Sequence, residues 1–167
     1  LGTTLTGFGL GFWYLDKYTS TTSYSLILFA AGAPAILLTP LFGVIVDRFN
    51  RRKVLFIGHA GAGCCSALVI LLYCMEYMHV GLLLLPIIIS SALNTMIRPA
   101  FTAVTTQLVP ADQLGRASGL IGFGNSLVML TALPVASLLL ETITMGGILV
   151  IDIVTFAVAL IVLTLIK

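Results

Sequence analysis

The sequence predicts an all-α membrane protein with six transmembrane helices. Of its 167 residues, 59% are apolar and only 8% are charged, and the mean hydropathy is +1.16; soluble domains carry about a quarter charged residues. The apolar residues form long runs without the period-two alternation of barrel strands, so the runs are expected to be helices. A bilayer core about 30 Å thick needs about 20 apolar residues per helix, which leaves room for about six passes.

The first apolar run covers residues 1–15 and ends in the polar patch 16–20. It is short for a span, and it starts without Met inside an apolar stretch, so we expect the start of the first helix to be missing from this fragment. The second run, 23–46, would extend about 35 Å as a helix, enough to cross with some tilt. The charged turn 47–53, in which five of seven positions carry a charge, ends it.

The third run, 54–73, returns across the membrane and is closed by a polar segment that contains Glu76. The fourth run, 82–108, is long enough to cross the bilayer. The polar turn 109–116 follows it. These two runs are therefore expected to be antiparallel helices.

The fifth run is 117–140 and the sixth is 146–166, with the segment 141–145 expected to form a loop between them. No linker or change of composition divides the chain. Residues 1–167 are therefore predicted to form one bundle of six transmembrane helices.

Lysine and arginine are distributed unevenly between the two ends of the predicted bundle. The turn after the first helix holds Lys17, whereas the turns at the opposite end, together with the end of the chain, hold Arg48, Arg51, Arg52, Lys53, Arg116 and Lys167. Because positive charge is retained in the cytoplasm, we expect the basic turns and both ends of the chain to be cytoplasmic. The expected location is the plasma membrane.

Several function classes are not supported by the sequence. The net charge of +2 is too small to suggest a nucleic-acid partner. Cys64, Cys65 and Cys74 lack metal-ligand spacing, so no metal or other cofactor is expected. No catalytic motif is present and acids and histidines are few, so we predict neither catalytic residues nor enzyme activity.

The pattern Gly43-x-x-x-Asp47-Arg48-x-x-Arg51-Arg52-Lys53 lies between the second and third predicted helices. It resembles the signature loop of the major facilitator superfamily of secondary transporters. The segments 33–56, 98–120 and 147–160 look like the corresponding parts of its bacterial drug, macrolide and siderophore efflux branch, which implies a location in the bacterial inner membrane. The resemblance implies the amino-terminal six-helix half of a transporter, built from two inverted three-helix repeats, whose partner is the missing carboxy-terminal half.

The resemblance also implies a cytoplasmic gate. Asp47 would face the positive end of a helix in the other half, with a stabilisation of about 0.3–2 kcal/mol, and Gly43 would allow a neighbouring helix to approach closely. The alternative is that the five charges only fix the topology. Asn50 replaces the glycine usual in this loop, and we expect it to tolerate a left-handed turn. The sequence around Pro134 lacks the glycines that often accompany proline in the fifth helix of drug antiporters. This difference weakens the case for proton–drug exchange.

Charged residues inside the membrane cost about 2.5–3.5 kcal/mol each and are candidate functional residues. Arg98 and Asn94 lie one turn apart on the fourth helix, which in this fold lines the central cavity, so they are candidate cavity residues. The alternative for Arg98 is an extension of its side chain to the lipid headgroups. Trp13 and Tyr14 are candidate cavity residues on the first helix or, alternatively, interfacial aromatics.

Asp152 lies inside the sixth helix. We expect this acid to make a helix-packing contact rather than to carry a proton, and we expect no direct pair with Arg98, because the two residues differ in height by roughly 15 Å. His59 is likewise interpreted as a packing residue rather than a proton carrier.

The predicted function is secondary active transport by alternating access, as proton-coupled export of an amphipathic small molecule. The principal alternative is a non-transporting membrane anchor or interaction module derived from a half-transporter. A homomeric channel ranks last because no filter segment is present. The substrate, the coupling ion and the direction of flux are not fixed by these residues.

Overall fold

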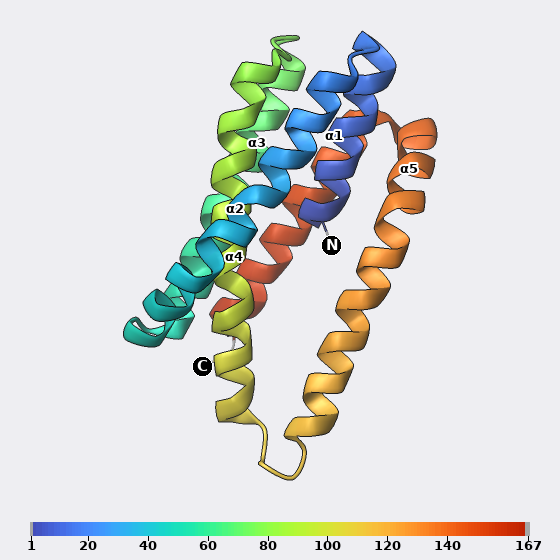
Figure 1. Cartoon of the computed structure of the whole chain (residues 1–167). Helices are drawn as coiled ribbons and strands as arrows, with labels where there is room; N and C mark the ends of the chain where they lie inside the picture. Colours follow the sequence, from blue (N-terminus) through green and yellow to red (C-terminus); the bar gives the residue numbers. More distant parts are fainter. Residues whose placement is uncertain (1, 166–167) are drawn as a thin grey trace.

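The structure is a computed structural model that describes residues 2–165, apart from the side chains of Asp47, Gln107 and Leu108. This part of the chain contains five α-helices and no strand (Figure 1). The helices are α1 (Gly2–Tyr18), α2 (Thr21–Arg48), α3 (Arg51–Cys74), α4 (Val80–Leu108) and α5 (Leu114–Leu165). The predicted all-α class is therefore confirmed.

Four of these helices are long and apolar enough to cross a membrane. The candidate spans are Thr21–Val46, Arg51–Cys74, Val80–Thr106 and Leu114–Leu165. The helix α1 has 17 described residues. The chain is thus a multi-pass membrane protein.

The helix α5 is interrupted at Thr144. Its 52 residues would extend about 78 Å as one rod, more than twice the thickness of a bilayer core. Thr144 has non-helical dihedral angles (φ 61°, ψ 174°), and here the chain turns back, so that the orange segment before the break and the red segment after it run in opposite directions (Figure 1). The expected loop 141–145 is wrong, because helical bonding continues on both sides of this single break.

The charged turn 47–53 is also shorter than expected. Only Phe49 and Asn50 lie outside helices, and the three basic residues after them form the first turn of α3. Asn50 is the N-cap of α3: its side chain accepts a hydrogen bond from the Arg52 backbone N–H at 3.0 Å. With φ −63° it is extended rather than left-handed, so the position requires an asparagine cap and not glycine-like freedom.

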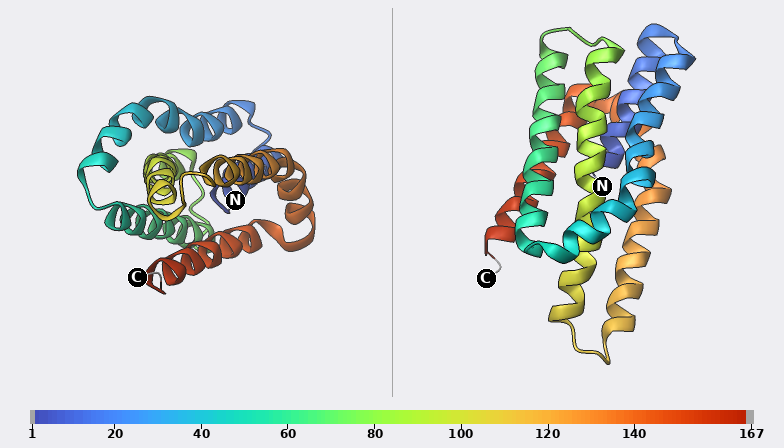
Figure 2. Two further views of the ribbon diagram at one scale, coloured as in Figure 1. Left: turned by 90° about the horizontal axis from the view of Figure 1, so that it is seen from below. Right: turned by 60° about the vertical axis from the view of Figure 1, so that its left-hand side comes forward.

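The helix α4 lies between α2 and α3 and packs against both, whereas α2 and α3 make little contact with each other (Figure 2). The helix α1 packs on α2 and α5, and α5 also packs on α3. One apolar core joins all five helices. Its fully buried side chains include Leu10, Ile27, Val69, Leu83 and Leu149, one from each helix.

The turns of the bundle lie at two ends. The α1–α2 turn, the α3–α4 turn and the break in α5 lie at one end, and the α2–α3 and α4–α5 turns at the other (Figure 1). The second end therefore collects Arg48, Arg51, Arg52, Lys53 and Arg116, and we call it the basic end. Lys17 lies at the opposite end, and Lys167 is outside the described residues.

Candidate functional site

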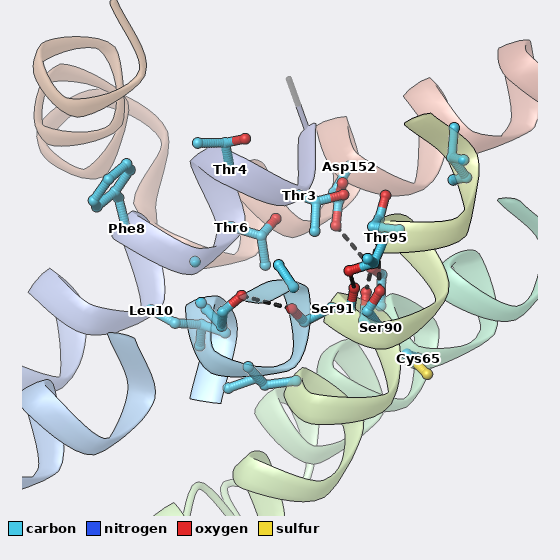
Figure 3. A pocket seen from close by; sticks show the side chains of 18 of the residues that line it. Thr3, Thr4, Thr6, Phe8, Leu10, Cys65, Ser90, Ser91, Thr95 and Asp152 are labelled. Atoms are coloured by element: carbon cyan, nitrogen blue, oxygen red, sulfur yellow. Dashed lines mark hydrogen bonds between the residues drawn. The ribbon is translucent and has the colours of Figure 1, made fainter. Parts of the chain in front are cut away.

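A cavity of about 760 Å³ lies between α1, α2, α4 and the two segments of α5, and α3 contributes part of its lining. This volume is within the range of about 300–1,000 Å³ that is typical of small-molecule sites. Figure 3 shows the side chains around it, which come from helices far apart in the sequence. The cavity is the candidate functional site.

The α4 wall carries a polar stripe. Ser90, Asn94 and Arg98 follow one another at four-residue steps, which places them on one face of the helix, and all three line the cavity. Asn94 Nδ2 donates a hydrogen bond to Ser90 O at 2.8 Å. Ser91 Oγ donates to Ala31 O of α2 at 2.6 Å, which ties these two walls together.

The α1 wall presents three threonines, Thr3, Thr4 and Thr6, beside Phe8 (Figure 3). Polar side chains are rare in so apolar a helix, and here three of them lie in its first described turn and a half. This wall therefore supplies hydroxyl groups next to an aromatic ring.

The remaining walls are largely apolar. The helix α2 contributes residues such as Leu28 and Ala35, and the first segment of α5 contributes Val128 and Met129 with Asn125 as its polar group. An apolar cavity with a few polar groups suits a molecule that is itself partly apolar and partly polar.

Asp152 also lines this cavity, from the second segment of α5. Its side chain is 1% exposed, and its Oδ2 accepts a hydrogen bond from Ser66 Oγ at 2.7 Å. This bond joins α5 to α3, and Asp152 lines the cavity as well. Arg98 lines the same cavity and is exposed; among the described side chains, no hydrogen bond joins the two residues.

Trp13 and Tyr14 lie outside the lining of the cavity. Tyr14 is buried in the core, and its hydroxyl donates to Met78 O at 3.0 Å. Trp13 packs edge-on against Tyr73, with 5.9 Å between the ring centroids, and the Lys17 ammonium group lies 4.7 Å from the Trp13 ring. Both residues thus belong to an aromatic cluster at the end of α1 opposite the basic end.

The predicted gate residues lie at the basic end, away from the cavity. A Cβ atom added at Gly43 would meet no atom within 4 Å in the described chain. Arg52 donates from Nη2 to Leu163 O at 3.0 Å and to Thr164 O at 3.2 Å. It thereby satisfies carbonyl groups at the carboxyl end of α5, where the helix dipole favours a cation.

The other basic residues of this end are arranged differently. Arg48 and Lys53 are exposed, and Arg51 is half-buried, with a buried Nε that has no described hydrogen-bond partner. The side chain of Asp47 is outside the described residues.

Most hydroxyl groups of the cavity were not predicted. Thr6, Ser66, Ser90 and Thr95 all line it, although each is a common residue in packed transmembrane helices. The four-residue step that joins Asn94 to Arg98 also reaches Ser90 and was the one signal available. The α1 threonines and Ser66 depend on which helix faces which, and spacing within one helix does not contain that information.

No metal site is formed within residues 2–165, where no three His, Cys, Asp or Glu side chains come together. The three cysteines of this part are free thiols.

The whole chain, residues 1–167, matches the sequence profile of the Major Facilitator Superfamily. It is 24% identical over 164 residues to the uncharacterised MFS-type transporter YkuC of Bacillus subtilis (strain 168), covering 95% of this chain and 37% of that protein. It is 29% identical over 161 residues to macrolide efflux protein A of Streptococcus pyogenes, covering 93% and 38%, and 30% identical over 139 residues to macrolide efflux protein A of Enterococcus faecalis, covering 80% and 42%. No solved structure gives a significant match.

The chain thus spans less than half the length of these relatives. The relatives with an assigned activity are efflux proteins, and members of this superfamily are transporters rather than enzymes. The profile match extends over every residue of the chain. The chain therefore belongs to the Major Facilitator Superfamily of membrane transporters.

Proposed function

We propose that this chain is the amino-terminal six-helix half of a secondary transporter that exports an amphipathic small molecule in exchange for protons. The two segments of α5 count as the fifth and sixth helices. The observation that carries the proposal is the cavity of about 760 Å³, with hydroxyl and amide groups on α1 and α4 and apolar side chains on α2 and α5. An amphipathic molecule would find both kinds of wall there.

The packing of the helices supports two inverted three-helix repeats. The contact of α2 with α4 has a counterpart in the contact of α1 with α5, as expected if α1–α3 and α4–α5 are related by a two-fold axis. The two-fold rotation would then place the α2–α4 contact on the contact between α1 and the first segment of α5.

Large exposed side chains support a missing second half. Ile36 (80% exposed) and Leu37 (71%) on α2, and Leu120 (73%) and Leu130 (77%) on α5, leave both flanks of the cavity apolar and uncovered by described residues. Relatives more than twice as long supply chain for a second bundle. Lipid would cover whatever the second bundle does not.

The distribution of charge supports a cytoplasmic position for the basic end, in the plasma membrane. There the residues of the predicted gate, Gly43 and Asp47, would meet a helix of the second half. The open space beside Gly43 is compatible with such an approach.

Transport is tested with the parent protein in everted vesicles. A panel of labelled compounds that includes a macrolide is offered with a proton gradient, without one, and with a protonophore. We expect gradient-dependent accumulation of at least one amphipathic compound. Accumulation of none would favour the alternative, a membrane anchor or interaction module.

The gate is tested separately with Asp47→Asn. We expect slower transport with unchanged insertion, because a neutral side chain interacts less favourably with a helix dipole; up to about 2 kcal/mol is at stake. The control is Asp112→Asn, which removes an exposed acid from the other turn of the same end. Transport at the wild-type rate by the Asp47 variant would leave the loop with a topological role alone.

A further inference from the structure

We propose that Asp152 is the site at which this transporter takes up its coupling proton; the proposal rests on the proposed function and names the residue that performs one part of it. The structure brings together three features at this position. They are a buried carboxyl group with one free oxygen, a hydroxyl donor on its other oxygen, and a location on the wall of the transport cavity.

The carboxyl group is buried almost completely. It is 1% exposed, and Oδ1 has no hydrogen-bond partner among the described residues, while Oδ2 accepts from Ser66 Oγ at 2.7 Å. An ionised carboxylate in such a place is costly unless a cation or several donors compensate it. Neutral hydroxyl donors are weak compensation for a full charge, and the addition of a proton removes that charge.

An acceptor for that proton lies on α1. Thr6 Oγ1 is buried and has no described partner, and Thr6 lies on the cavity wall near Asp152 (Figure 3). A threonine hydroxyl can both donate and accept, so Thr6 can donate to the ionised Oδ1 and can accept from the O–H group that Oδ1 gains with a proton. Thr6 therefore serves both protonation states, and the Ser66 bond to Oδ2 remains in both.

The space around Oδ1 favours a proton over any larger cation. A methyl group built on Gly2 would collide with Asp152 Oδ1 and with Thr155 Oγ1. The backbone of α1 therefore lies directly against the carboxyl group, and an amine of a substrate has no room beside that oxygen. A hydrogen atom fits without displacement of α1.

The surroundings of Asp152 contain few other charged or titratable groups. The nearest candidates on the helices that pack against it are Asp16 and Lys17 of α1, His59 and Cys65 of α3, Arg98 of α4 and Glu141 of α5. Asp16 and Lys17 lie about 20 Å along α1 from Gly2. His59 contacts Phe156, with 6.1 Å between the ring centroids, one turn from Asp152, and Arg98 lines the open part of the same cavity.

The alternating-access cycle gives the proton a role. With Asp152 neutral, the polar wall can close against the second half without burying a charge. With Asp152 ionised, closure would exclude water from the cavity and remove the remaining solvation of the carboxylate, so the state open to water is favoured. Uptake of one proton therefore shifts the equilibrium between the two states.

The first test uses infrared difference spectroscopy on the purified parent protein, titrated over a range of pH without substrate. We expect a carboxylic acid C=O band that disappears in Asp152→Asn and persists in Glu141→Gln, the matched removal of an exposed acid on the same helix. Ser66→Ala should displace the titration by about one pH unit. A band unchanged by Asp152→Asn, or displaced by sodium rather than by pH, would overturn the assignment.

The second test measures coupling in proteoliposomes with a labelled macrolide as probe. One coupled proton supports about tenfold accumulation per pH unit of gradient. We expect Asp152→Asn to lose this accumulation but to retain exchange of labelled for unlabelled compound, and Asp152→Glu to recover part of it. Loss of exchange together with accumulation in both variants would indicate a structural role and overturn the assignment.

The two tests separate the two proposals. The infrared titration needs no transport, so it remains informative if the wild-type protein moves no compound, in which case the proposed function fails. If the wild-type protein and the Asp152→Asn variant accumulate the probe equally well, the proposed function stands and Asp152 is not the proton site.

Discussion

Two glycine-rich stretches of the chain, residues 58–63 in α3 and 115–124 in α5, are alike in sequence and opposite in environment. In α3, Cβ atoms built on Gly58, Gly61 and Gly63 would lie 2.9, 2.6 and 3.4 Å from atoms of neighbouring helices. In α5, none of the four glycines at positions 115, 119, 122 and 124 has a described atom within 4 Å of such a Cβ.

The difference teaches what a small-residue pattern means in a membrane helix. Glycine permits close approach, but it does not say which helix approaches or whether that helix belongs to the same chain. The α3 glycines are used within this bundle, against α4 and the second segment of α5. The α5 glycines face away from it, toward lipid or toward the proposed second half.

The largest expected effect comes from the replacement of one glycine in each stretch by leucine. Gly58→Leu should destabilise the folded protein by about 1–3 kcal/mol, because the new side chain must displace Ile97 of α4. The matched Gly119→Leu should cost far less within the bundle, since its surroundings are open. Thermal unfolding in detergent measures both, and equal destabilisation would show that the two stretches are not different.

The second prediction asks what the α5 glycines meet in the parent protein. The proposed alternating-access cycle has two conformations. If a second bundle packs on the α5 glycines in only one of them, Gly119→Leu would destabilise that conformation by about 1 kcal/mol and change the ratio of the two about fivefold. We expect transport to change accordingly, with Gly119→Ala closer to wild type. Wild-type transport by the leucine variant would assign this face to lipid.

The third prediction concerns the start of α3, where packing against α5 continues through a polar contact. Arg52→Gln should cost about 1 kcal/mol, because the carbonyl groups of Leu163 and Thr164 lose a cationic donor. Lys53→Gln, its exposed neighbour, should leave the unfolding midpoint unchanged. An equal shift in both variants would point to net charge as the cause.

The smallest expected effect has opposite signs in the two stretches. Gly122→Ala should stabilise α5 by about 0.5–1 kcal/mol through helix propensity, because nothing obstructs the new methyl group. Gly58→Ala should instead destabilise the protein slightly, since its methyl group would lie 2.9 Å from Ile97 Cγ1 and one of the two must shift. Chemical denaturation in mixed micelles measures the change in the free energy of unfolding for each variant. A gain in stability from Gly58→Ala would mean that Ile97 of α4 moves aside at little cost.

The helical class, the positions of the long helices and the superfamily could be predicted from the sequence, because hydropathy and the signature loop are local signals. Helix ends were less accurate. The hydrophilic side chains of Arg51, Arg52 and Lys53 favour a loop for the first turn of α3, although Asn50 carries the capping signal of a helix start. Likewise, 141–145 has no proline or glycine, so helical bonding persists up to the break at Thr144.

Half of the candidate site could be predicted and half could not. Asn94 and Arg98 share one face of one helix, so a spacing rule finds them. Asp152, Ser66 and Thr6 come from three helices, and their meeting depends on how α1 and α3 pack on α5. Trp13 and Tyr14 lie on the first helix, yet the rotation of α1 turns them into the core and presents threonines to the cavity.

The Arg52 contact has a consequence for biogenesis. It joins residues 111 positions apart in the chain, the first turn of α3 and the last turn of α5. During synthesis, the guanidinium group is made long before its carbonyl acceptors leave the ribosome. α3 must therefore enter the bilayer with a cation at its margin that is solvated by water and headgroups, and the contact between α3 and α5 can form only after the second segment of α5 has emerged from the translocon.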